Sequence, residues 1–114
     1  MKTLNAIITK AEIQLDGVFL LMSLTLELEN GGGVGFGGGR LLFRKGDQYS
    51  PTGNNCAGYF ITRVMEIARV EEFSELEGKP IRAIFEGKGM CGDKIIGIQD
   101  FLKEDKFIPD EIFG

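Results

Sequence analysis

The feature that most constrains the fold is a glycine tract at residues 31–39, Gly-Gly-Gly-Val-Gly-Phe-Gly-Gly-Gly. Glycine stands at every odd position of the tract, and successive residues of a strand point to opposite faces. As a strand, the tract therefore has one face without side chains, while Val34, Phe36 and Arg40 project from the other. Each interior glycine costs about 0.5–1 kcal/mol relative to alanine. Close packing against the bare face is needed to offset that cost.

Three occupants of the bare face are considered. We favour a helix at residues 56–69, because its Ala57, Gly58 and Ala68 are small enough to settle close to a sheet. A second copy of the chain is the next alternative. The third is a flat ligand ring lying against exposed peptide planes.

The sequence on either side of the tract predicts antiparallel strands. Residues 7–15 and 18–29 alternate between apolar and polar side chains, which is typical of half-buried strands. Asp16-Gly17 between them predicts a tight turn, and a second turn is expected near residues 29–32. The side chains predicted to face the core are Ile7, Ala11, Ile13 and Leu15 in the first strand, and Val18, Leu20, Met22, Leu24, Leu26 and Leu28 in the second.

The second half of the chain predicts a helix followed by two strands. Apolar residues recur at spacings of three and four from Cys56 onward, which places Ala57, Phe60, Ile61, Val64 and Ala68 on one helical stripe. A short helical turn is expected at 72–76, strands at 81–86 and 95–102, and a docked tail at 106–113. The order β-β-β-α-β-β predicts a single compact α+β domain over residues 1–114, with a mostly antiparallel sheet.

Composition and charge argue against several classes of function. A formal net charge of −4 argues against a nonspecific nucleic-acid binder. The sequence shows neither the apolar core of a signal peptide nor a membrane span, so we expect a cytoplasmic protein. It contains no His and only two distant Cys, which disfavours a metal site and acid–base catalysis. We therefore expect no cofactor, and enzymatic activity is disfavoured although Asp, Glu and Lys can act as catalysts.

A dinucleotide-binding loop is rejected. Residues 33–38 fit G-x-G-x-x-G formally, but the chain continues into Arg-Leu-Leu-Phe rather than opening a helix.

Several segments together resemble one family. They are Gly35-Phe36-Gly37-Gly38, the helix from Gly58 to Ile67, the stretch from Leu76 to Arg82 and the ending Phe107-Ile108-Pro109-Asp110-Glu111. Their order is similar to that of small bacteriophage and prophage proteins that include the first-described Thoeris anti-defence sponges. Val34 and Gly39 depart from the pattern, where a polar and an aromatic residue are expected. The resemblance implies a non-catalytic homo-oligomer in the host bacterial cytoplasm. It also implies that the protein sequesters a cyclic nucleotide immune signal, such as a cyclic ADP-ribose isomer or a cyclic oligonucleotide.

A nucleotide site needs cations or amides for phosphate and aromatic faces for bases. We expect it where the start of the helix meets the glycine-rich hairpin at 87–93, with Arg40 beside the glycine strand as a further positive group. The candidate ligand-binding residues are Arg40, Asn54, Asn55, Tyr59, Arg63, Phe85, Lys88 and Asp93. Five of them have a plainer role: Tyr59 and Phe85 as core or rim, Arg63 paired with Glu66, Asn55 as a helix cap, and Arg40 as part of a solvated edge.

Two other functions stay open. The first is an inhibitor that covers the active site of a host defence enzyme with acidic residues such as Glu71, Glu72, Glu75 and Glu77. The second is a small hydrolase that uses Glu or Asp.

Overall fold

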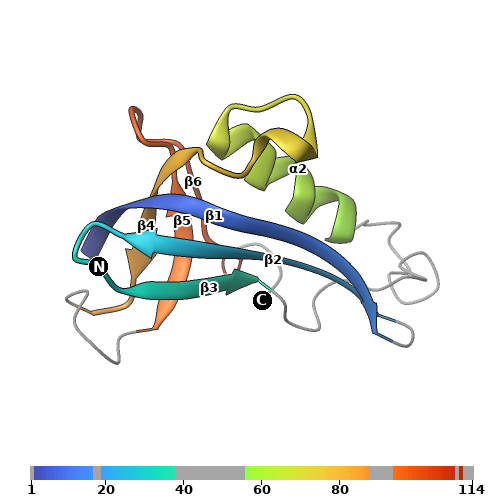
Figure 1. Ribbon diagram of the computed structural model, residues 1–114, viewed down its shortest axis with the longest axis horizontal. Helices are drawn as coiled ribbons and strands as arrows, with labels where there is room; N and C mark the ends of the chain where they lie inside the picture. Colours follow the sequence, from blue (N-terminus) through green and yellow to red (C-terminus); the bar gives the residue numbers. More distant parts are fainter. Residues whose placement is uncertain (1, 17–18, 38–55, 88–93, 110, 112–114) are drawn as a thin grey trace.

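The strands form one antiparallel sheet that curls around a single helix in the described part of the chain (Figure 1). The computed structural model describes residues 2–16, 19–37, 56–87, 94–109 and 111. Its elements in chain order are β1 (Lys2–Asp16), β2 (Phe19–Leu28), β3 (Gly33–Gly37), α2 (Cys56–Ala68), a 3₁₀ turn (Phe73–Glu75), β4 (Pro80–Phe85), β5 (Ile95–Gln99) and β6 (Lys106–Phe107). The sheet order is β3-β2-β1-β4-β5-β6. The predicted α+β class and antiparallel sheet are confirmed.

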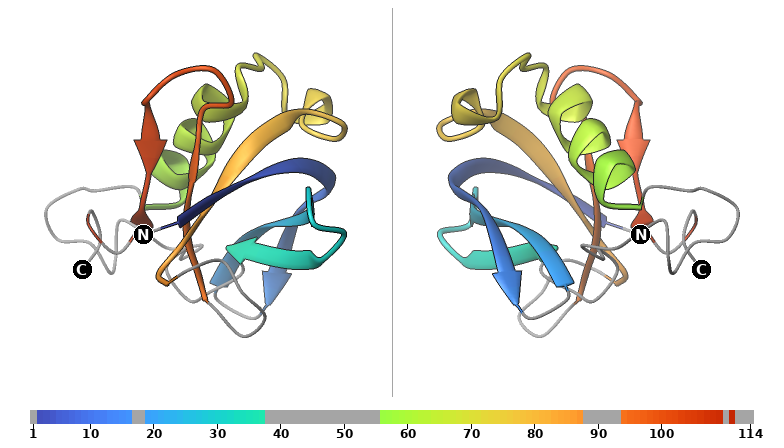
Figure 2. Two further views of the ribbon diagram at one scale, coloured as in Figure 1. Left: turned by 90° about the vertical axis from the view of Figure 1, so that its left-hand side faces the viewer. Right: turned by 90° about the vertical axis from the view of Figure 1, so that its right-hand side faces the viewer.

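The hydrophobic core lies between α2 and the inner face of the curled sheet (Figure 2). Phe36 of β3 stacks on Phe60 of α2 with ring centroids 5.7 Å apart, and Phe107 of β6 meets Phe60 edge-on at 5.2 Å. Three aromatic rings thus join both edge strands of the sheet to the helix. Such pairs contribute roughly 0.5–1.5 kcal/mol each beyond the burial of their area.

The alternation predicted for β2 is confirmed from Met22 to Leu28, whereas the one for β1 is partly wrong. The predicted turn at Asp16-Gly17, Val18 and the side chains of Leu15 and Leu20 lie outside the described residues. Met22, Leu24 and Leu26 are buried. In β1, however, Ala6 and Ile8 are buried and Ile7 is 43% exposed, so the first part of the strand has the opposite phase. The reason is a bulge between residues 8 and 10 that resets the alternation. An alternation of apolar and polar residues that is counted from Ile7 therefore does not continue beyond the bulge.

Beyond the bulge, the side chains predicted to face the core lie on the inner face of β1, but they are less buried than expected. Ala11 packs at the margin of the core. Ile13 pairs with the buried Met22 and therefore lies on the same face, yet it is 44% exposed.

The glycine strand is a true strand with its bare face turned outward. Phe36 is 5% exposed and pairs with Leu24, while Gly33 and Gly35 are exposed. A Cβ added to Gly35 meets nothing closer than the carbonyl oxygen of Leu24 at 3.9 Å. The expectation that α2 rests on these two glycines is therefore wrong, because the helix lies on the Phe36 side. Arg40 and Gly39 fall outside the described residues.

The turn predicted at residues 29–32 is confirmed. Gly31 has a φ of 90°, and its N–H donates to the carbonyl of Leu28 at 2.9 Å. The side chain of Asn30 accepts a hydrogen bond from the Gly32 amide at 3.0 Å. The left-handed conformation of Gly31 and the hydrogen bond from the Gly32 amide to the Asn30 side chain together close β2 onto β3.

Gly35→Ala is expected to stabilise the protein by about 0.5–1 kcal/mol, because the added methyl group makes only an ordinary van der Waals contact and reduces the entropy of the unfolded chain. Urea denaturation measures this change. Gly37→Ala is the matched control in the same strand: Gly37 has a φ of 90°, and its added Cβ would collide with the Met22 carbonyl and lie 3.2 Å from the Phe60 ring. It should destabilise. Equal effects of the two changes would contradict the outward orientation.

The helix and the elements after it agree closely with the sequence. On α2, Phe60, Val64 and Ala68 are buried and Ile61 packs against the core, as expected. Ile67, also buried, was not predicted. The 3₁₀ turn lies within the predicted segment 72–76 and has a capping box between Glu72 and Glu75. The side chain of Ala57 lies outside the description.

The end of the chain differs from expectation in one respect. β5 stops at Gln99 rather than at residue 102, and the chain turns back into β6. Docking of the tail is confirmed for Phe107 and Ile108, which are 2% and 6% exposed. Within the described ranges, none of the helical segments has the length and apolar character needed to cross a bilayer.

Candidate functional site

Three of the eight predicted site residues lie in the described part of the chain. Tyr59 and Arg63 are one turn apart on α2, and Phe85 ends β4. Arg40, Asn54, Asn55, Lys88 and Asp93 lie outside the described residues. The junction predicted between the helix start and the hairpin at 87–93 therefore stays a prediction.

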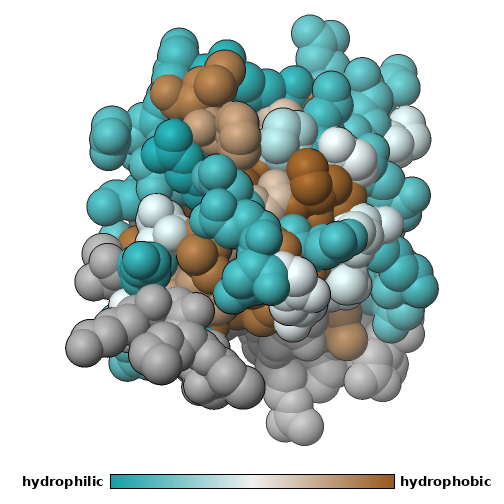
Figure 3. All heavy atoms as spheres, turned by 60° about the vertical axis from the view of Figure 1, so that its left-hand side comes forward, coloured by the Kyte–Doolittle hydropathy of each residue, from teal (hydrophilic) through white to brown (hydrophobic). Residues whose placement is uncertain are grey.

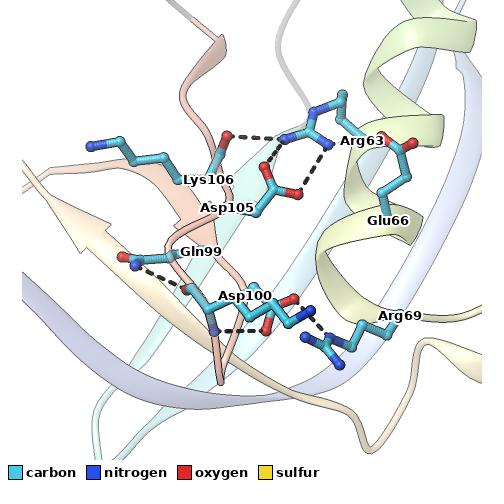
Figure 4. Close-up of polar contacts among 8 residues, drawn as sticks. Arg63, Glu66, Arg69, Gln99, Asp100, Asp105 and Lys106 are labelled. Carbon is cyan, nitrogen blue, oxygen red and sulfur yellow. Dashed lines mark hydrogen bonds and ion pairs between the residues drawn. The ribbon is translucent and has the colours of Figure 1, made fainter.

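Arg63 is engaged in a network of its own (Figure 4). Its guanidinium lies 2.8 Å from Oε1 of Glu66 and 2.8 Å from Oδ1 of Asp105, and it donates to the carbonyl of Lys106 at 3.0 Å. The hydrogen bond to Asp105 has the largest influence on the pKa of Arg63 and, together with Glu66, raises it against the opposing effect of burial. The predicted Glu66 pair is thus present. A phosphate would have to displace Asp105 to reach this cation.

Tyr59 presents an aromatic surface near the start of α2. Its side chain is 43% exposed, and its ring tilts at 60° against Phe107 with centroids 6.2 Å apart. The first turn of the helix carries no acidic side chain. No side chain of that turn therefore offsets the positive end of the helix dipole. An exposed ring next to such a helix start suits a ligand that has both a base and a phosphate.

Phe85 does not fit the role of a base platform. It is 3% exposed and belongs to the main core cluster. Its ring cannot stack on a ligand while it fills the core. The plainer interpretation of Phe85 as a core residue is supported.

A polar cluster that the sequence reasoning missed holds the loop between β5 and β6 (Figure 4). Asp100 is 4% exposed and accepts hydrogen bonds from Nε of Arg69 and from the amides of Leu102 and Lys103, at 2.8, 2.8 and 3.2 Å. Burial is the largest influence and tends to raise the pKa of Asp100, but these hydrogen bonds together lower it. An Asp directly after an apolar strand is a typical turn signal that could have been recognised.

A groove of about 450 Å³ was also missed. Its lining includes Asn5, Ile7, Glu27, Glu29, Pro80 and Phe101, which come from three strands, the β2–β3 turn and the β5–β6 loop. On the side of the molecule that carries the β2–β3 turn, apolar atoms form separate patches among hydrophilic side chains (Figure 3). No Lys or Arg belongs to the groove lining among the described residues. Its chemistry does not suit a phosphate.

The residues that the structure describes include no group of three His, Cys, Asp or Glu arranged to hold a metal ion. A scan of the sequence against protein-family models and a search among curated proteins each find no match.

Proposed function

We propose that the protein binds a small nucleotide signal and holds it without changing it chemically. The ligand class is a cyclic ADP-ribose isomer or a cyclic oligonucleotide, as the resemblance to the phage sponges implies. The observation that carries the proposal is the exposed ring of Tyr59 beside an acid-free helix start. The same resemblance supports a homo-oligomer that acts in the cytoplasm of a bacterial host.

In this proposal, the base stacks on Tyr59 and the phosphates face the first amides of α2. Arg63 acts indirectly, since its bonds to Asp105 and to the Lys106 carbonyl hold β6, and with it Phe107, against the helix. Phe107 in turn supports the Tyr59 ring. Asn54 and Asn55, which precede α2 directly in the sequence, remain candidate ligands, as do Arg40, Lys88 and Asp93.

Storage rather than turnover is supported by the chemistry of nearby groups. The whole sequence contains no His. The carboxylates of Glu66 and Asp105, on α2 and on the loop beside it, are both paired with Arg63. A general base must reach the proton that it abstracts, and both carboxylates are instead turned toward the guanidinium of Arg63, so neither group is well placed for that role.

Tyr59→Ala is expected to weaken nucleotide binding about tenfold, because stacking of one base on an aromatic ring contributes roughly 1–3 kcal/mol. Calorimetric titration with a panel of cyclic ADP-ribose isomers and cyclic oligonucleotides measures this. Tyr59→Phe, which keeps the ring, should bind nearly as well as the wild type, and Thr62→Ala controls for an exposed change on the same helix. A panel that gives no heat with the wild-type protein would refute the proposal.

A further inference from the structure

The groove identified above lies on the outer face of the sheet. Ile7 is the register partner of both Glu27 and Pro80, so these three side chains share one row across β2, β1 and β4. The next residue of that row is Gly33 in β3, which pairs with Glu27. Along this row, the apolar side chains of Pro80 and Ile7 are followed by the carboxylate of Glu27 and then by Gly33, which has no side chain.

The charge in the groove is purely acidic within the described lining. Glu27 has no hydrogen-bond or ion-pair partner among the residues that the structure describes. Glu29 is held in place, since Oε1 accepts a hydrogen bond from the Asn5 amide at 3.0 Å. Its other oxygen has no partner in the same described part. The groove therefore has capacity for two cationic groups.

The apolar part of the lining suits the stems of long basic side chains. Ile7 is 43% exposed, and Pro80 and Phe101 complete the apolar surface. Lys and Arg bury their methylene stems on apolar surface while the charged head stays in a polar environment, and a guanidinium also stacks on aromatic rings. The volume of about 450 Å³ falls within the range of roughly 300–1,000 Å³ that is common for ligand pockets.

The bare glycines favour an extended chain over a compact cation. From the groove, the outer face continues over Gly33 and Gly35, both exposed, and an added Cβ there has only ordinary contacts. A polypeptide can run from the groove across this strip without collision. Glu27 lies in β2 and Glu29 follows in the β2–β3 turn, and both line the groove. Alternate residues of an extended chain are about 7 Å apart and project from the same side, so two long basic side chains at that spacing can reach both carboxylates.

We propose that this groove docks an extended segment of a partner protein carrying two basic residues two positions apart, Arg-Xaa-Arg or Lys-Xaa-Lys. The two heads pair with Glu27 and Glu29, and the stems cover Ile7 and Phe101. This surface is separate from the nucleotide site proposed at Tyr59.

The test uses a fluorescein-labelled peptide, Gly-Ser-Arg-Thr-Arg-Ser-Gly, and anisotropy at low salt. The wild-type protein should bind it, and the same peptide with citrulline for both Arg should not bind. Glu27→Gln combined with Glu29→Gln should weaken binding by about tenfold or more. Gln at 29 still offers an acceptor to Asn5. Glu71→Gln combined with Glu104→Gln removes the same charge from exposed positions elsewhere and should change binding little.

Four results would overturn the proposal. The first is that the Arg peptide does not bind up to about 1 mM, and the second is that the control variant weakens binding as much as the groove variant does. The third is that spermidine displaces the peptide at the same concentration as the peptide itself. The fourth is that the groove variant differs from the wild type in oligomeric mass. The last two would assign the groove to a small cation or to a second copy. Nucleotide titration of the groove variant should match that of the wild type. The docking proposal is therefore tested independently of the nucleotide site proposed at Tyr59.

Discussion

Replacing Asp100 by Ala is expected to lower the free energy of unfolding by roughly 2–3 kcal/mol, because hydrogen bonds to a buried charged group are among the strongest in proteins. The carboxylate accepts from Arg69, Leu102 and Lys103, and the side chain is 4% exposed. Without it, two amides of the β5–β6 loop lose their acceptor. Arg69 is 45% exposed and can turn to water, so the loss arises mainly from the loop.

Urea denaturation at neutral pH measures this loss, and Asp100→Asn is the matched control. The amide oxygen of Asn can still accept from the Leu102 and Lys103 amides, so this variant should lose less. If Asp100→Ala were as stable as the wild type, the loop would not depend on this carboxylate.

The same carboxylate gives a pH dependence with a defined sign. The folded pKa of Asp100 lies below its ordinary value, so the folded state binds the proton less readily than the unfolded chain does. The stabilisation is therefore complete above the unfolded pKa of about 3.9 and is lost as the pH falls through the folded pKa. Between neutral pH and acid, the wild type should lose more stability than Asp100→Asn. Parallel pH profiles would contradict this.

Gly97→Ala is expected to destabilise the protein by about 1–3 kcal/mol, the usual cost of forcing atoms into a packed site. A Cβ at Gly97 would lie 2.5 Å from the carbonyl oxygen of Phe107 and 2.8 Å from Cγ1 of Ile108. The first of these atoms is backbone and cannot rotate away. The strand β6 must shift, and with it the Phe107 ring that contacts Phe60.

Hydrogen exchange at Phe107 and Ile108, together with denaturation, measures the change at Gly97. Gly35→Ala is the internal control, since the same methyl group there has only an ordinary contact, 3.9 Å from the Leu24 carbonyl oxygen. The two variants should move stability in opposite directions. A neutral Gly97→Ala would mean that the tail does not press on this glycine in solution.

Local patterns predicted most of the fold. The alternation of β2, the helical stripe through Phe60 and Val64, and the turn at Gly31 depend on neighbours within a few residues, so the sequence shows them directly. Ile7 was assigned to the wrong face because a bulge changes the phase of a strand without a clear local signal.

The occupant of the glycine face could not be predicted, because it depends on which side of the sheet receives α2. Both faces of the tract are compatible with a helix in sequence terms. The structure places Phe36, not the glycines, against Phe60. The outward face is therefore available to a ligand or partner from outside the chain, which is the premise of the docking groove.

The candidate site was the hardest part to predict. Asp105 lies 42 positions from the arginine it binds, and nothing near Arg63 in the sequence indicates that partner. The groove gathers Ile7, Glu27 and Pro80 from three strands, and only the sheet register brings them together. Tyr59 could be singled out because it is an aromatic residue next to the predicted start of the helix.

The most direct test of the proposed function is to incubate the protein with the mixed cyclic nucleotides, remove unbound material, denature the protein by heat and analyse the released small molecules by mass spectrometry. We predict that one nucleotide is recovered intact and in stoichiometric amount, and that Tyr59→Ala retains much less of it. Recovery of a cleaved product, or of no nucleotide at all, would contradict storage by this protein.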